Sequence, residues 1–158
     1  MAKRKNWFSL FFTNYLGVLN DNFLKTLAGF ICIAWVGKEN ESMVVTLASA
    51  ALVIPYLLFS PLAGRLAKIY KKRKIVVWAK FAEMLIMVVA TAGFLTHSTG
   101  LVLSSILLMG LQSALFSPSK YGLIRDIGGE EGISYGSGAM EMFAFVGILT
   151  GTLMAAFL

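Results

Sequence analysis

Five apolar stretches, separated by short polar connections, account for most of this chain and restrict its fold. They cover about residues 7–36, 43–67, 75–96, 101–124 and 135–158. Each one reaches the roughly 20 residues that a helix needs to cross a bilayer. Of the 158 residues, 58% are hydrophobic and 14% are charged, whereas an ordinary soluble domain carries roughly 25% charged residues. The sequence therefore predicts an all-α membrane protein: one membrane domain over residues 1–158, with about five transmembrane helices.

The connection over residues 60–74 is strongly basic and contains no acid. Its basic residues are Arg65, Lys68, Lys71, Lys72, Arg73 and Lys74. Such a cluster is typical either of a nucleic-acid-binding surface or of a cytoplasmic turn between membrane helices. The apolar stretches on both sides favour the membrane turn, so we expect no nucleic acid among the partners.

Most of the other basic residues are predicted to lie on the same side of the membrane as this connection. One side of the membrane receives Lys3, Arg4, Lys5, the basic connection and Arg125, and the other side receives Lys38. Because Lys and Arg are retained in cytoplasmic loops, the N-terminus is predicted to be cytoplasmic in a multi-pass protein.

Polar residues interrupt the first apolar stretch and define a candidate site. Asn14, Gly17, Asp21 and Lys25 fall on one face of a helix. An ionisable residue inside a span costs roughly 2.5–3.5 kcal/mol and often marks function. Asp21 and Lys25 have the spacing of an ion pair that only holds helices together, but nearby amides favour a site for a headgroup or an ion. The candidate polar site is Asn20, Asp21, Asn22, Lys25 and Glu141.

Two further patterns concern helix packing. Lys80 and Glu83 are separated by three residues and carry opposite charges, which favours a structural pair. Gly147 and Gly151 form a G-x-x-x-G pattern, which lets helix backbones approach closely in lipid. For Glu141 a gating role and a structural role remain equally open, and Glu141 or Lys120 would also suit a snorkelling position at the interface.

Catalytic and metal-binding patterns are absent from the sequence. It contains one cysteine and one histidine, and no H-E-x-x-H, C-x-x-C, G-x-S-x-G or phosphate-binding glycine loop. We therefore expect a protein that is not an enzyme and uses no metal or cofactor.

The basic connection resembles the cytoplasmic signature of the major facilitator superfamily, which reads roughly G-x-L-A-D-R-x-G-R-R. Gly64, Leu66, Ala67, Lys72 and Arg73 match it, while Lys68 stands where the signature has an acid. Two further motifs, Asn20-Asp21-Asn22-x-x-Lys25 and Phe116-x-Pro118-x-Lys120-Tyr121, are similar to the lysophospholipid transporter (flippase) branch. The gating residues implied by the resemblance are Gly64, Arg65, Lys68, Lys72, Arg73, Lys80, Glu83, Lys120 and Tyr121.

The resemblance implies a fold of twelve helices in two six-helix bundles that work by alternating access. The five predicted helices would form most of one half, so the chain is expected to be the N-terminal part of a longer transporter, with the C-terminal half as a missing partner. The implied substrates are lysophospholipids, moved from the outer to the inner leaflet of the bacterial cytoplasmic membrane. Asp21 would be the polar site on the first helix, and an acyltransferase–acyl-carrier-protein synthetase would re-acylate the product.

Three alternatives stay open on sequence alone. The chain could belong to a different facilitator that exports a drug or a small solute. It could be the membrane portion of a fused acyltransferase. It could also be a small accessory membrane protein that is complete at 158 residues.

Overall fold

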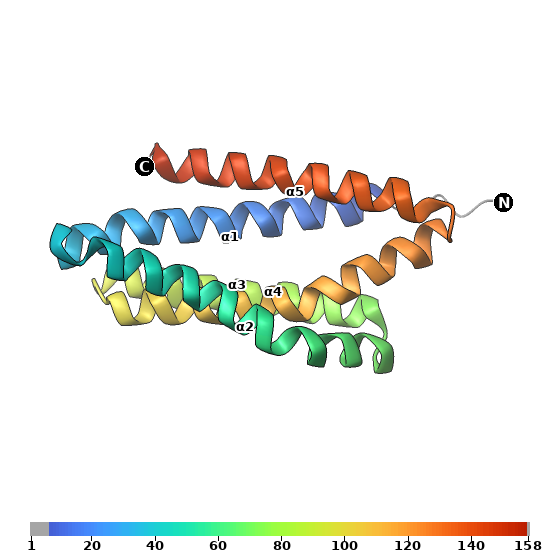
Figure 1. The fold of residues 1–158 in the computed structure, drawn as a ribbon, viewed down its shortest axis with the longest axis horizontal. Helices are drawn as coiled ribbons and strands as arrows, with labels where there is room; N and C mark the ends of the chain where they lie inside the picture. Colours follow the sequence, from blue (N-terminus) through green and yellow to red (C-terminus); the bar gives the residue numbers. More distant parts are fainter. Residues whose placement is uncertain (1–6, 158) are drawn as a thin grey trace.

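The computed structural model describes residues 7–157, with only the backbone described for Lys38, and it is helical throughout its length (Figure 1). The described elements are α1 (Trp7–Val36), the short 3-10 helix η1 (Lys38–Asn40), α2 (Glu41–Ile69), α3 (Lys72–Leu95), α4 (Thr99–Gly128) and α5 (Gly132–Ala156). Over these residues, five helices are long and apolar enough to cross a membrane. The prediction of an all-α membrane protein is confirmed. Lys3, Arg4, Lys5 and Leu158, which entered the predictions above, lie outside the described residues.

The observed helices are longer than predicted at several ends. α3 begins at Lys72, within the predicted turn, and the Lys72 side chain forms an ion pair with Asp126 of α4. α4 continues through Pro118 and ends only where Gly129 adopts a φ of 66°, a left-handed conformation that glycine adopts without strain. α5 therefore begins at Gly132 rather than near residue 135.

Prolines bend two of the helices. α2 contains Pro55 and Pro61, and α4 contains Pro118. A proline inside a helix removes one backbone hydrogen bond and clashes with the preceding turn, which kinks the helix. Figure 1 shows α2 changing direction along its length and the last part of α4 rising toward α5.

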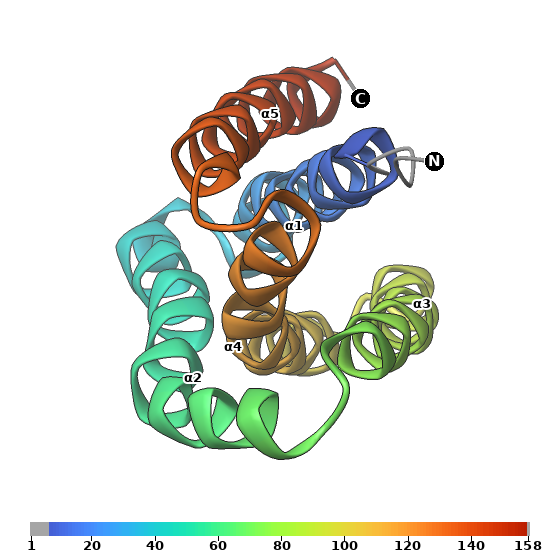
Figure 2. The same ribbon diagram turned by 90° about the vertical axis from the view of Figure 1, so that its right-hand side faces the viewer.

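The helices pack as two close pairs with α3 added at one side. Figure 2 shows α5 beside α1 and α2 beside α4, with α3 on the other flank of α4. Glycines permit both pairs. A Cβ on Gly147 would lie 2.9 Å from the Tyr15 carbonyl oxygen of α1, and one on Gly110 would lie 2.6 Å from the Leu52 carbonyl oxygen of α2. Since backbone atoms cannot move aside, only glycine allows these approaches.

Two apolar clusters fill the interior at different depths. The first contains Leu24, Ala28, Cys32, Val44, Ala48, Ile86, Ala90, Val102, Ile106 and Met109. The second contains Leu10, Phe11, Ile124 and Met140. Large apolar side chains such as Leu57, Val88 and Leu149 are instead exposed on the outside of the bundle, as expected for surfaces that face lipid.

Candidate functional site

A polar cavity of about 110 Å³ lies between α1, α2, α3 and α4. On α1 its residues fall between Phe11 of the second apolar cluster and Leu24 of the first, so the polar layer is enclosed by apolar layers along the helix. The polar side chains that line the cavity are Asn14, Asp21, Tyr56, Lys80, Glu83, Gln112, Ser113, Ser117 and Lys120. The cavity therefore gathers charges in the middle of an otherwise apolar bundle.

Asp21 of α1 is only partly satisfied in this cavity. Its Oδ2 accepts a hydrogen bond of 2.8 Å from the Ser113 hydroxyl of α4. Its Oδ1 is buried and has no hydrogen-bond partner among the described residues. Because an unpartnered buried carboxylate oxygen is costly, this atom is suited to accept a hydrogen bond from a ligand.

Lys80 and Glu83 of α3 form the tightest ion pair on the cavity wall. Lys80 Nζ lies 2.6 Å from Glu83 Oε2, and the Glu83 residue is 8% exposed. Asn20 of α1 donates a hydrogen bond of 3.0 Å to the other carboxylate oxygen, Oε1. The pair therefore joins α3 to α1. The nitrogen of Lys80 also lies against Gly17, where a larger residue would displace it.

Lys120 of α4 faces the same cavity from the other side. Its Nζ donates a hydrogen bond of 3.1 Å to the side-chain oxygen of Asn14, and Asn14 Nδ2 donates to the carbonyl oxygen of Met140 in α5 at 3.2 Å. Lys120 Nζ lies 6.0 Å and Lys80 Nζ 5.2 Å from the ring centre of Phe116, so both cations approach one aromatic ring. Lys80 is neutralised by Glu83, whereas the hydrogen bond of Lys120 to Asn14 is to a neutral amide.

The cavity thus offers one carboxylate oxygen and one ammonium group to a ligand. Asp21 and Lys120 carry opposite charges within the same small space. Such a pair suits a ligand that carries both charges, or a polar group that both donates and accepts hydrogen bonds. No group of three or more His, Cys, Asp or Glu residues suited to a metal occurs in the part of the chain that the structure describes.

A second set of polar contacts lies where α4 approaches α3 and α5 beyond the cavity. Tyr121 of α4 donates a hydrogen bond to the Glu141 carboxylate of α5. Lys72 Nζ at the start of α3 lies 2.7 Å from Asp126 Oδ1 and also donates to the Gly122 carbonyl oxygen of α4 at 3.3 Å. The basic position of the facilitator-like signature therefore binds an acid of α4.

The candidate residues predicted from sequence separate into three places. Asn20, Asp21, Lys80, Glu83 and Lys120 meet in or beside the polar cavity, and Tyr121 meets Glu141 outside it. Asn22 donates back to the Val18 carbonyl of its own helix, and no ion pair within residues 7–157 joins Asp21 to Lys25. The remaining signature residues lie in the last turns of α2 and the first turn of α3 and are exposed or half-exposed: Gly64, Arg65, Lys68 and Arg73.

Apart from Lys120, the residues that α4 contributes to the cavity were not predicted from the sequence. Gln112, Ser113 and Phe116 line it together with Lys120. Gln112, Phe116 and Lys120 follow one another at intervals of four, which places them on one helical face. That spacing, together with an amide inside an apolar stretch, was the signal that could have identified them.

The exposed contact between Lys72 and Asp126 gives a small expected effect. We expect Asp126→Asn to lower the free energy of unfolding by less than about 1 kcal/mol, because half-exposed ion pairs contribute little. Unfolding by SDS in mixed micelles measures this change. Glu131→Gln, which alters an exposed acid on the α4–α5 connection, is the control. A loss of several kcal/mol for Asp126→Asn alone would contradict the expectation.

Residues 10–137 match the family model described as "Transmembrane secretion effector", a model of the major facilitator superfamily. Two curated relatives are similar to part of the chain, and both carry the name "Lysophospholipid transporter LplT". The protein from Photorhabdus laumondii subsp. laumondii is 27% identical over 109 residues, which is 67% of this chain and 25% of that protein. The protein from Pectobacterium carotovorum subsp. carotovorum is 28% identical over 103 residues, which is 63% of this chain and 23% of that protein.

The alignments therefore span about a quarter of the length of these curated relatives. No solved structure matches the chain.

Proposed function

Since the chain belongs to the transmembrane secretion effector family of the major facilitator superfamily, we propose that it forms the lysophospholipid-binding part of a membrane transporter. It is a multi-pass membrane protein of a transporter family rather than an enzyme family. The names of its two relatives support the choice of solute, and the polar cavity supports the choice of site.

The observation that carries the proposal is the unpartnered Oδ1 of Asp21 inside an apolar bundle. A lysophospholipid combines a polar headgroup with an apolar tail. The ammonium of an ethanolamine headgroup, or the hydroxyls of a glycerol headgroup, would donate to Asp21. The phosphate would approach Lys120, which has donors beyond the one used by Asn14. Apolar clusters above and below the polar cavity would keep water from the headgroup.

For the transport step we propose alternating access, with lysophospholipid moved from the outer to the inner leaflet of the bacterial cytoplasmic membrane. In this mechanism two bundles rock around a shared site, and we place the second bundle outside these 158 residues. An acyltransferase–acyl-carrier-protein synthetase would then re-acylate the product.

The proposed orientation has a cytoplasmic N-terminus. Figure 1 shows the start of α1, the α2–α3 connection and the α4–α5 connection at the same end of the bundle. That end carries the basic residues from Arg65 to Lys74 and also Arg125. Lys and Arg are retained on the cytoplasmic side, which supports this orientation.

A second candidate function is export of a small amphipathic solute. The description of the matching family, a secretion effector, favours it. The same polar cavity would then bind a cation through Asp21. A lysophospholipid and an amphipathic cation are therefore compared directly in the experiment below.

The test is equilibrium binding of fluorescent lysophosphatidylethanolamine to the chain in nanodiscs. We expect Asp21→Asn to weaken binding about tenfold, because a hydrogen bond to a charged group contributes about 1.5–3 kcal/mol. Glu39→Gln, which makes the same charge change at an exposed position of η1, should leave binding unchanged.

Tetraphenylphosphonium is added as a competitor to separate the two functions. If lysophosphatidylethanolamine binds tightly and this cation displaces it poorly, the result supports the lipid proposal. Strong binding of the cation without measurable lysolipid binding would replace it with the export function. Equal effects of Asp21→Asn and Glu39→Gln would remove Asp21 from the site.

A further inference from the structure

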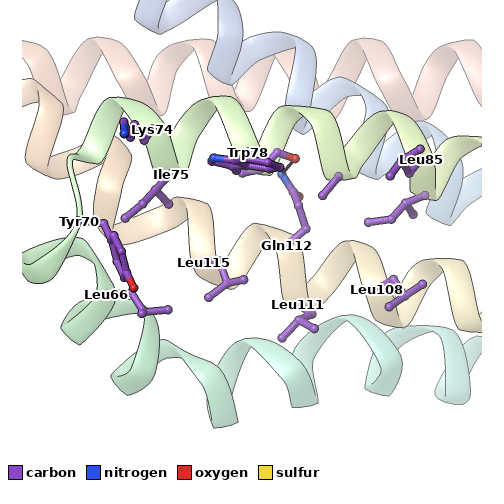
Figure 3. Close-up of a pocket in the computed structure, with 13 residues that line it drawn as sticks. Leu66, Tyr70, Lys74, Ile75, Trp78, Leu85, Leu108, Leu111, Gln112 and Leu115 are labelled. Carbon is purple, nitrogen blue, oxygen red and sulfur yellow. Dashed lines mark hydrogen bonds between the residues drawn. The ribbon is translucent and has the colours of Figure 1, made fainter.

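A second cavity is larger than the polar cavity and differs from it in its lining. It is an apolar groove of about 780 Å³ between α2, α3 and α4. Figure 3 shows its residues lying along these three helices, with Tyr70 and Lys74 at one end and Leu85 and Leu108 toward the other. Most other lining side chains are apolar, among them Trp78, Ala82 and Leu115.

The groove exists because α2 and α3 scarcely touch, although they are consecutive. Both pack on α4 instead, and the two prolines of α2, Pro55 and Pro61, accompany its change of direction. The α3 lining includes two small residues, Ala79 and Ala82, which leave space between the larger side chains. Trp78 lies within the groove yet is 70% exposed, so the groove is open to the surroundings of the bundle.

The groove is closed toward the polar cavity by Gln112, which lines both spaces. Its Nε2 donates a hydrogen bond of 3.1 Å to the Ala79 carbonyl oxygen, and the residue is 5% exposed. A molecule in the groove would therefore contact α2, α3 and α4 without reaching Asp21. The groove is a second site, independent of the solute that binds in the polar cavity.

One end of the groove is basic. Lys74 lines it directly, while Arg65 and Lys68 lie in the last turns of α2 and Lys71 lies on the α2–α3 connection. Lys72 is already bound to Asp126, whereas none of the ion pairs within the described residues involves Lys74. Tyr70 lines the same end, with its hydroxyl directed toward Leu66 and away from Lys74 (Figure 3). The ammonium group of Lys74 is complementary to an anionic headgroup.

The length of the groove fits one leaflet. From Lys74 to Leu85 the α3 axis rises by roughly 16 Å. Half of a hydrocarbon core that is roughly 30 Å thick is about the same distance. An acyl chain that starts at the basic end would therefore reach the middle of the bilayer inside the groove.

We propose that the apolar groove binds an anionic diacyl phospholipid of the phosphatidylglycerol type as a resident lipid. Its phosphate contacts Lys74, and one acyl chain lies along Trp78 and Ala82 between α2 and α3. The lipid fills the space that α2 leaves when it bends away from α3.

Trp78 allows a direct test, because bromine on an acyl chain quenches a tryptophan that it touches. The chain is reconstituted in phosphatidylethanolamine vesicles that contain equal mole fractions of brominated phosphatidylglycerol or brominated phosphatidylethanolamine. The difference between the intact chain and Trp78→Phe isolates the signal of Trp78 from the other two tryptophans. We expect about a five-fold preference for phosphatidylglycerol, the contribution of one lysine near an anionic headgroup.

Three variants complete the design. Lys74→Gln should reduce the preference to less than about two-fold, while Lys68→Gln, an equal charge change at an exposed residue outside the groove lining, should keep it. Ala82→Phe should fill the groove and lower quenching by both lipids, with circular dichroism confirming unchanged helicity.

Equal quenching by the two lipids would overturn the proposal, since any acyl chain would then occupy the groove. An equal loss in Lys68→Gln and Lys74→Gln would overturn it in favour of a diffuse basic surface. Absence of quenching at Trp78 would mean that protein, such as a further helix, covers the groove, and this too would overturn it.

Discussion

Gly151→Leu is expected to detach α5 from α1 and to lower the free energy of unfolding by about 3 kcal/mol or more, the upper range for overpacking. A Cβ at this position would collide with the Leu19 carbonyl oxygen and would lie 3.1 Å from the Phe23 backbone nitrogen. Both are backbone atoms of α1, so they cannot move aside for the added side chain unless the whole helix moves. The two helices would have to separate along the whole contact.

Trp7 provides the measurement, since it contacts α5 from the start of α1. Its ring packs edge-on against Tyr135, with 5.9 Å between ring centroids, and a Cβ on Gly136 would lie 2.6 Å from it. In a Trp35→Phe, Trp78→Phe background, which leaves Trp7 as the single tryptophan, SDS-induced unfolding followed by tryptophan fluorescence reports on the α1–α5 contact. We expect the transition to begin at a lower SDS fraction when Gly151→Leu is added to this background.

Gly138→Leu is the matched control in the same helix. A Cβ at Gly138 meets nothing within 4 Å, so the change should be neutral or slightly stabilising, because leucine favours helix by up to about 1 kcal/mol over glycine. Equal losses in the two variants would contradict the packing argument and attribute the effect to helix α5 itself.

This contact shows how far the sequence determines the fold. The G-x-x-x-G spacing of Gly147 and Gly151 predicts a close helix contact, and the structure has one. The partner of α5 was not predictable, because α1 is far away in the chain and no pattern in it identifies α5. Lengths of apolar stretches fix how many helices there are, whereas the pairing depends on shapes that meet only in three dimensions.

The candidate site was predictable to a similar extent. The cost of an ionisable residue in a membrane singled out Asp21, Lys80 and Glu83 in the sequence. The spacing also offered Lys25 of the same helix as an ion-pair partner for Asp21, whereas in the structure the donor to Asp21 is Ser113 of α4. Local spacing shows which groups can meet within one helix, but a membrane helix satisfies its polar groups mainly through its neighbours.

Lys80→Met is expected to produce the second large effect, because it would leave the Glu83 carboxylate in the bundle without its cation. Glu83 would keep only the hydrogen bond from Asn20. Removing one member of a buried ion pair costs about 3–5 kcal/mol. Since the Lys80 side chain is 26% exposed, we expect a smaller loss of about 2–3 kcal/mol, at or just below the lower limit of that range, again measured by SDS-induced unfolding.

The double variant Lys80→Met, Glu83→Met separates the charge from the packing. With both charges removed, no uncompensated carboxylate remains, so the double variant should recover most of the lost stability. Arg125→Met is the control, because it breaks an exposed ion pair with Glu130. The Arg125 side chain is 66% exposed and that of Glu130 is 85% exposed, so the free energy of unfolding should fall by under about 1 kcal/mol. If the double variant were as unstable as Lys80→Met alone, the loss would come from the Lys80 side chain filling the space beside Gly17 and Phe116. The Lys80–Glu83 pair would then position the wall of the polar cavity through the volume of its side chains rather than through its charges. Lysolipid binding should in that case fall equally in Lys80→Met and in the double variant.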